Sequence, residues 1–166
     1  IANSGRQKKY WKVDFFGGEP SDELAGVKDL VAYGREQEKI HIKTSVFTLT
    51  TNGVLVNDEV MEFCNKEMGN VVMSIDGRKE VHDHMRPFRK GAGSYDLVVP
   101  KFQKWAESRN QDKYYARGTF THYNLDFSKD VLKSGRSGIQ TDLCRAGCGT
   151  FGCGLRIAAG RSSETV

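Results

Sequence analysis

The chain has 166 residues, a length that suits one domain of ordinary size rather than two. Apolar residues make up 38% of it and charged residues 28%, proportions that are typical of a globular protein and argue against a disordered one. The net charge of +4 is a mild excess, whereas nucleic-acid-binding proteins usually carry a stronger charge asymmetry, so we expect no nucleic-acid partner.

The sequence also bears on where the protein works. No apolar stretch approaches the roughly 18–20 residues that a membrane-spanning helix needs, so we expect no membrane partner. Residues 1–20 lack a charged segment followed by an apolar one, which predicts no signal peptide and a cytoplasmic protein. Because Ile1 stands first instead of methionine, we expect the sequence to begin inside a larger protein.

Strand-like and helix-like patterns alternate along the first half of the chain. Residues 10–16 and 45–51 are rich in β-branched and aromatic side chains, which predicts a strand in each. Residues 22–38 place their apolar side chains at helical spacing, which predicts an amphipathic helix. Asn57 is a good N-cap for a second helix over about residues 57–68.

The second half continues this alternation. Residues 70–76 and 113–122 predict two further strands, with a polar loop and then a helix over residues 94–109 between them. A short helix is expected to begin near Asp126. Strands that alternate with helices predict βαβ units and therefore a parallel sheet. We expect the α/β class, as part of a (βα) barrel or of an open doubly wound sheet, incomplete at both ends of the sequence.

Small and polar side chains lie at the end of each predicted strand. Ligands of parallel βα folds gather at the carboxyl ends of the strands, so these side chains predict one shared binding rim. Glycines allow a ligand to approach the backbone, and a carboxylate accepts from a cationic amine, although each feature alone is also typical of an ordinary turn. The candidates, in chain order, are Gly17, Gly18, Glu19, Thr51, Asn52, Ser74, Asp76, Arg117 and Thr119.

The ordered motifs GGEP, TNG, SIDG, HDHMR and GAGS resemble the radical S-adenosylmethionine (radical SAM) superfamily. The resemblance covers about residues 8–132 and is greatest to the peptide maturases with a C-terminal auxiliary-cluster (SPASM-type) domain, above all to the thioether-forming maturases of six-cysteine (SCIFF) precursor peptides. It implies a partial radical SAM core over residues 1–132.

The resemblance also implies roles for individual residues. Gly17, Gly18 and Glu19 match the motif that binds the methionyl amine of S-adenosylmethionine. Ser74 matches a residue that contacts this cofactor, and Arg86 matches the arginine that pairs with its carboxylate, a role that suits the guanidinium fork. The remaining members of the implied cofactor rim are Thr51, Asn52, Asp76 and Arg117.

In the family, a [4Fe–4S] cluster cleaves S-adenosylmethionine, and the resulting radical starts the formation of a cysteine thioether crosslink in a cysteine-rich precursor peptide. The cluster cysteines of the family lie upstream of the GGE motif, whereas this chain has no cysteine before Cys64. We therefore expect the chain to be an inactive fragment by itself, with the cluster ligands in the full-length parent. An anaerobic sulfatase-maturase-like protein is the alternative within the superfamily.

The cysteines and histidines have alternative interpretations. Cys64 falls inside a predicted helix and is expected to be a packed core thiol. His82 and His84 are expected to be polar loop residues rather than a metal pair. The remaining cysteines are Cys144, Cys148 and Cys153, and their spacing resembles an iron–sulfur triad but differs from the spacing in radical enzymes. A non-enzymatic metal-binding module built on these three cysteines is therefore a further alternative.

The character of the chain changes at about Lys133, where periodicity vanishes and Gly, Arg, Ser and Cys become frequent. Read in a shifted frame with free choice of synonymous codons, residues 135–148 can encode ADLGFKQISVEPVV, which has a helix end, a glycine cap and an alternating strand. We interpret residues 133–166 as a frameshifted, non-native tail and expect no regular strand in them.

Overall fold

Strands and helices alternate along the chain as expected for the α/β class. The structure is a computed structural model, and it describes residues 10–41, 43–121, 124–126, 128–130, 133, 139 and 143–146. Its elements are β1 (Tyr10–Phe15), η1 (Pro20–Glu23), α1 (Leu24–His41), β2 (Thr44–Thr51), α2 (Asp58–Glu67), β3 (Met68–Ser74), α3 (Lys79–Met85), α4 (Tyr95–Ser108), β4 (Tyr114–Phe120) and β5 (Leu143–Ala146).

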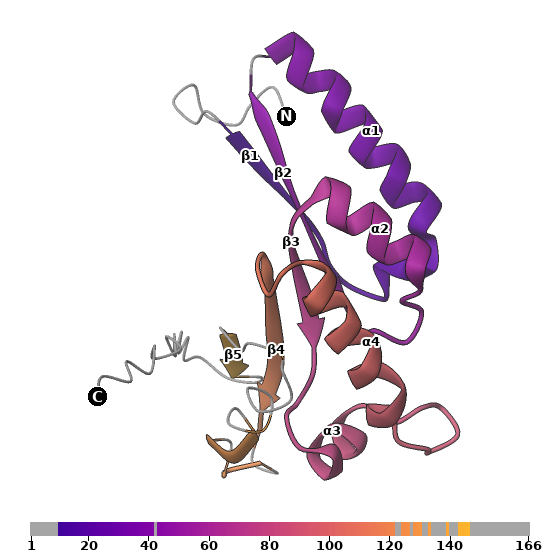
Figure 1. Ribbon diagram of the computed structural model, residues 1–166, viewed down its shortest axis with the longest axis vertical. Coiled ribbons are helices and arrows are strands. Elements are labelled where there is room, and N and C mark those ends of the chain that lie inside the picture. Colours follow the sequence, from indigo (N-terminus) through magenta and orange to yellow (C-terminus); the bar gives the residue numbers. More distant parts are fainter. Residues whose placement is uncertain are drawn as a thin grey trace, which may run out of the picture.

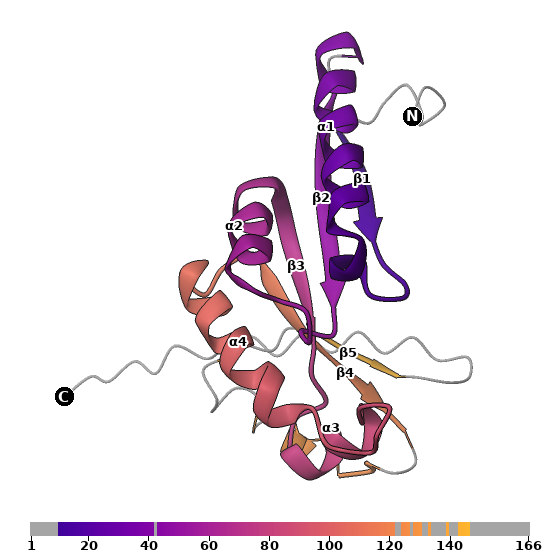
Figure 2. The same ribbon diagram turned by 90° about the vertical axis from the view of Figure 1, so that its right-hand side faces the viewer.

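All described strands belong to one parallel sheet. Its order, β1-β2-β3-β4-β5, follows the chain order, and every neighbouring pair is parallel. Helices α1, α2 and α4 lie to the right of the strands in Figure 1, and Figure 2 views the molecule from that side. Because every strand runs the same way, the four loops that follow β1 to β4 emerge at one end of the sheet.

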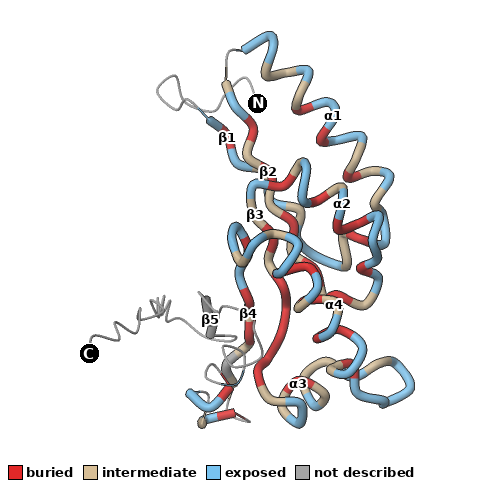
Figure 3. Tube along the Cα trace, viewed as in Figure 1, coloured by how far each residue is buried: buried red, intermediate tan, exposed pale blue. Residues whose placement is uncertain are grey.

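The hydrophobic core lies between the sheet and its helices. Successive side chains of a strand point to opposite faces, and in β2 and β3 the alternate residues Phe47, Leu49, Val71 and Met73 are almost fully buried. Figure 3 shows the buried positions concentrated along these strands and on the inner sides of the helices. The helices contribute Val27, Val31, Val98, Phe102 and Trp105 to the same core.

Two local predictions for α2 are confirmed. Asn57 is the N-cap, and its side-chain oxygen accepts a hydrogen bond from the Val60 backbone N–H at 2.9 Å. Cys64 is fully buried in the core, and burial raises the pKa of its thiol to about 12. The thiol is therefore a packing group and not a nucleophile.

Two segments differ from the predictions. The polar loop expected after residues 70–76 contains the helix α3, whose seven residues bury only His82 and so show no apolar periodicity. The expectation that the tail holds no regular strand is wrong for β5, which pairs with β4 through Arg117 and Leu143. Residue 133 is helical, whereas the remainder of the proposed tail, apart from residue 139, lies outside the described residues.

The short helix expected near Asp126 is confirmed, because residues 128–130 are helical. Within the part of the chain that the structure describes, no helix is both long enough and apolar enough to cross a membrane.

Candidate functional site

Glu19 joins the loops that follow β1 and β2. Its Oε1 atom accepts a hydrogen bond from Thr51 Oγ1 at 2.7 Å, and its Oε2 atom accepts one from the Asn52 backbone N–H at 2.8 Å. The same carboxylate caps η1 by accepting from the Ser21 backbone N–H at 3.2 Å. These donors fix the carboxylate at the rim of the sheet, so its position does not depend on a ligand.

The two glycines before Glu19 leave the backbone open. Gly17 and Gly18 have φ values of 99° and 59°, which side chains of L-residues rarely adopt. Nothing lies within 4 Å of the position that a Cβ atom would take at either residue. The backbone conformation therefore disfavours any residue with a side chain at these two positions, and the space beside the backbone stays free. A small molecule could approach the backbone there.

Thr51 and Asn52 have different parts in the loop after β2. Thr51 is 1% exposed, and its hydroxyl both donates to Glu19 and accepts from the Gly53 backbone N–H at 3.0 Å. Asn52 accepts from the Val54 backbone N–H at 2.9 Å, which closes a local turn. Thr51 supports Glu19 from within the protein, and Asn52 lies at the surface of the site.

Asp76 and Arg86 form an ion pair behind the rim. The Asp76 carboxylate is 2% exposed, accepts from Arg86 Nε at 2.5 Å and accepts from the Thr119 backbone N–H at 2.7 Å. A second, longer bond of 3.4 Å joins Arg86 Nη2 to Asp76 Oδ1. One carboxylate thus ties the end of β3 to β4 and orients the guanidinium of Arg86.

His82 is a core residue, so the expectation of a polar loop residue is wrong for it. Its side chain has no exposed surface, and its Nδ1 and Nε2 atoms lie 3.3 Å from the Asp76 backbone N and 3.1 Å from Ser94 Oγ. Burial lowers the pKa of His82 below its ordinary value of 6.5. His84, by contrast, is exposed. Among the described residues, no three His, Cys, Asp or Glu side chains gather in a way that could hold a metal ion.

A pocket of about 580 Å³ opens between the loops after β1 and β2 and the segment after α3. Small-molecule sites usually have volumes of roughly 300–1,000 Å³. Glu19 and Arg86 line this pocket together with Asp22 and Arg89, so charges of both signs lie at its walls, which suits a ligand that carries both an ammonium group and a carboxylate. The lining residues are Glu19, Asp22, Asn52, Val54, Leu55, Arg86, Pro87, Phe88, Arg89 and Ser94.

The other predicted site residues lie outside this lining. Thr51 bonds to Glu19 and Asp76 bonds to Arg86, so both contact residues that line the pocket. Ser74 and Arg117 are neighbours in the register of β3 and β4, on the sheet face opposite the core helices. The Arg117 guanidinium lies 5.2 Å from the centre of the Phe16 ring. The structure therefore brings Glu19, Asn52 and Arg86 to one pocket and places Ser74 and Arg117 on the sheet.

Comparison with known proteins agrees with this architecture. No known family profile matches the chain. A curated relative, the radical SAM cyclopropyl synthase TigE of Paramaledivibacter caminithermalis, is 25% identical over 141 residues, which are 81% of this chain and 28% of TigE. The chain therefore spans less than a third of the length of this relative.

Several solved structures have the same fold. Native anSMEcpe with bound AdoMet aligns with a TM-score of 0.73 and 18% identity over 87% of this chain and 38% of its own. Native anSMEcpe with bound AdoMet and Kp18Cys peptide gives a TM-score of 0.72 and 18% identity, over 85% and 38% of the two chains. A domain of pyruvate-formate lyase-activating enzyme from Bacteroides vulgatus aligns with a TM-score of 0.59 and 14% identity, over 81% and 78%.

The parallel sheet, the helices on one of its faces and the polar strand ends define a partial (βα) barrel of the radical SAM type. The chain is similar in sequence to the radical SAM enzyme TigE and has the fold of the anSMEcpe structures.

Proposed function

We propose that this chain is the part of a radical SAM enzyme that binds the methionine end of S-adenosylmethionine. The observation that carries this proposal is the placement of Glu19 and Arg86 on one pocket. The methionine end of the cofactor has an ammonium group and a carboxylate, and Glu19 and Arg86 carry the charges opposite to these two groups.

The residues present fit this part of the cofactor. Gly17 and Gly18 do not line the pocket, but they precede Glu19 and leave open backbone that the ammonium group would contact. Arg86 uses its Nε edge on Asp76, and because Arg86 also lines the pocket, we assign the remaining N–H groups of its guanidinium to the ligand carboxylate. When bound, S-adenosylmethionine supplies hydrogen-abstracting radical chemistry in this superfamily, and the residues of this chain would hold and orient it.

The described residues do not fit the [4Fe–4S] cluster. No group of three candidate ligands gathers among them, and the one described free cysteine side chain, Cys64, is buried in the core. We therefore assign the cluster to the full-length parent and derive no step through it. The proposal of a metal-binding module on Cys144, Cys148 and Cys153 rests on positions whose side chains lie outside the described residues.

A peptide is the proposed substrate of the parent enzyme. Support comes from the peptide bound to anSMEcpe and from the motifs that resemble peptide maturases. Within that class we propose thioether crosslinking of a cysteine-rich precursor peptide by a SPASM-type enzyme, with a sulfatase-maturase-like enzyme as the alternative. Incubating the full-length parent with each peptide under anaerobic, reducing conditions separates the two: a loss of 2 Da supports the crosslink, and modification of a sulfatase peptide alone contradicts it.

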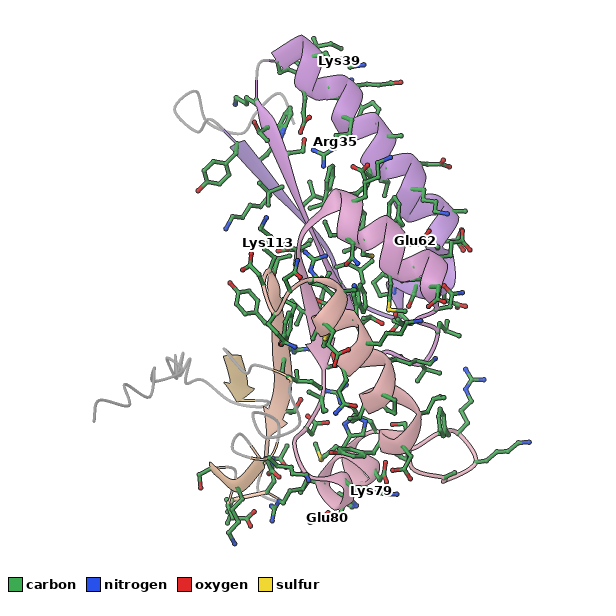
Figure 4. The ribbon with its side chains drawn as sticks, in the orientation of Figure 1. Arg35, Lys39, Glu62, Lys79, Glu80 and Lys113 are labelled. Carbon is green, nitrogen blue, oxygen red and sulfur yellow. The ribbon has the colours of Figure 1, made fainter. Side chains whose placement is uncertain are left out.

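Ligand binding by this chain tests the cofactor proposal directly. Titration calorimetry with S-adenosylmethionine is expected to show binding that Glu19→Gln and Arg86→Gln each weaken at least tenfold, about 1.4 kcal/mol. Glu62→Gln is the matched control, because Glu62 lies on α2 and is not part of the pocket (Figure 4). Equal affinity in wild type, Arg86→Gln and Glu62→Gln would contradict the proposal.

A further inference from the structure

The segment from Arg86 to Ser94 forms one wall of the pocket. Pro87, Phe88 and Arg89 line the pocket together with the two ends of the segment. A turn closes the segment internally, because the Phe88 backbone N–H donates to the Ala92 carbonyl at 2.8 Å. The position of this wall then depends on what holds its two ends.

Both ends of the wall are linked to His82 of α3. Ser94 contacts the His82 ring directly, and Arg86 is linked to it through Ser94. Ser94 Oγ donates its single hydrogen to the Arg86 carbonyl at 2.6 Å. It can therefore only accept in its 3.1 Å contact with His82, which makes His82 Nε2 the donor. On the other side of the ring, Nδ1 accepts from the Asp76 backbone N–H at 3.3 Å. These contacts define one state of the ring, a neutral imidazole with its hydrogen on Nε2.

The two contacts of the His82 ring are linked to different parts of Arg86, one to its backbone carbonyl and the other to its guanidinium. Through Ser94 the ring is linked to the Arg86 carbonyl, and through Asp76 it is linked to the residue whose carboxylate orients the Arg86 guanidinium. Figure 1 shows that α3 lies beside the end of α4 where Ser94 is the N-cap. A shift or a change of protonation at His82 would therefore act on Arg86 at both ends.

We propose that His82 is a positioning residue for ligand binding: its neutral imidazole, bonded to Ser94 and Asp76, holds Arg86 where the guanidinium meets the carboxylate of the ligand. The proposal rests on the proposed function of Arg86 and assigns His82 no contact with the ligand. His82 lies 0% exposed in the core, so any effect it has on binding must pass through its neighbours.

The electrostatic surroundings agree with a neutral ring. Burial lowers the pKa of His82, and the positive charge of Arg86 acts in the same direction, while Asp76 and Asp83 act against it. Tyr95, from α4, presents its ring to the imidazole at 5.7 Å and 76°. Protonation would place a hydrogen on Nδ1 against the Asp76 backbone N–H. The contribution of His82 to the affinity should therefore be constant above pH 6.5 and should be lost as the pH drops through the lowered pKa.

Two substitutions test the donor and the acceptor of the His82 ring separately. His82→Gln places an amide nitrogen near the position of Nε2 and loses the acceptor, whereas His82→Asn retains an acceptor near Nδ1 and loses the donor. His84→Gln, on the exposed side of the same helix, is the matched control. Titration of S-adenosylmethionine into the chain is expected to show at least tenfold weaker binding for both His82 variants, and unchanged binding for the control. If both variants fail to fold, Ser94→Ala tests the same link.

A double-mutant cycle separates positioning from a general effect on stability. If His82 acts through Arg86, the double variant His82→Gln/Arg86→Lys loses less binding free energy than the sum of the losses in the two single variants. In addition, His82→Gln removes the fall in affinity below pH 6.5. Additive losses with an unchanged pH profile would overturn the inference while leaving Arg86 in place. If wild type and Arg86→Gln bind S-adenosylmethionine equally, the proposed function itself fails, which is a separate result.

Discussion

At the scale of the residue, Asp76 connects several parts of the site. It is bonded to Arg86 and to the Thr119 backbone, while its own backbone N–H reaches His82. Breaking a buried ion pair by removing one partner usually costs about 3–5 kcal/mol, because the remaining charge is left unpaired. The Arg86 side chain is 25% exposed, so the lower part of that range applies.

Asp76→Asn is therefore expected to reduce the free energy of unfolding by about 3 kcal/mol in urea denaturation. Lys104→Gln provides the control, because the ion pair of Lys104 with Asp58 is exposed at 62% and 74% and should contribute less than about 1 kcal/mol. A loss at Asp76 no larger than the loss at Lys104 would show that the buried pair does not hold the strand ends together.

Cys64 gives a second test at this scale. Because burial raises the pKa of its thiol to about 12, the reactive thiolate is absent at pH 8. Alkylation with iodoacetamide at pH 8, followed by peptide mass mapping, is expected to leave Cys64 unmodified in the folded chain and to label it fully in urea. Rapid labelling without denaturant would place this thiol outside the core.

The pocket residues could be predicted from sequence to different degrees. Glu19 and Asn52 belong to motifs at the ends of strands, where a parallel sheet brings separate loops together. Arg86 directly follows α3 and was indicated only by the resemblance of its motif. His82 could not be placed, because its burial arises from packing between α3 and α4 and leaves no periodic pattern in a polar segment. Ser94 was visible only as part of a glycine-containing motif, and its bond to the Arg86 carbonyl depends on the closed turn.

At the scale of the element, strands and helices were predictable because their periodicities of two and about 3.6 residues are strong in this chain. The apolar positions of α1 show the limit of that approach. Val27 and Val31 are buried, whereas Leu30 and Tyr33 of the same pattern are 58% and 51% exposed. Spacing identifies a helix, but the side that packs is decided by the sheet beneath it.

Gly53, in the turn after β2, and Gly91, between α3 and α4, offer a matched pair of glycine substitutions. Gly53 has a φ of 81°, and an added Cβ atom would lie 2.5 Å from the Phe102 ring, whereas Gly91 has a φ of 83° with open space around it. Gly91→Ala should lower the free energy of unfolding by about 1 kcal/mol through backbone conformation alone. Gly53→Ala should lower it by about 3 kcal/mol, because overpacking adds its own cost. Equal losses in thermal or urea unfolding would contradict this account.

At the scale of the whole molecule, several apolar side chains lie at the surface of the first βα unit. Leu30, Tyr33 and Ile40 of α1 are 58%, 51% and 66% exposed, and β1 is an edge strand of the described sheet. Exposed apolar surface and an unpaired edge both favour association. We predict that this chain, expressed alone, self-associates in sedimentation experiments, and that Leu30→Gln combined with Tyr33→Gln reduces the effect. A monodisperse monomer that melts cooperatively would contradict the prediction.

The end of the chain is a second question at this scale. The strand β5 lies where the alternation of strands and helices calls for the next strand, beside β4. The shifted-frame interpretation of residues 133–166 remains a prediction that concerns the gene. Sequencing the locus is expected to reveal an interrupted frame near codon 133, and an uninterrupted frame that encodes the tail would refute it.

The central claim is that one zwitterionic ligand end is held between Glu19 and Arg86. A crystal structure of this chain soaked with S-adenosylhomocysteine tests it most directly, since that compound keeps the amine and the carboxylate. The account predicts the ammonium group beside Glu19 and the Gly17-Gly18 backbone, with the carboxylate on Arg86. A ligand bound with its amino-acid end away from both side chains would contradict it.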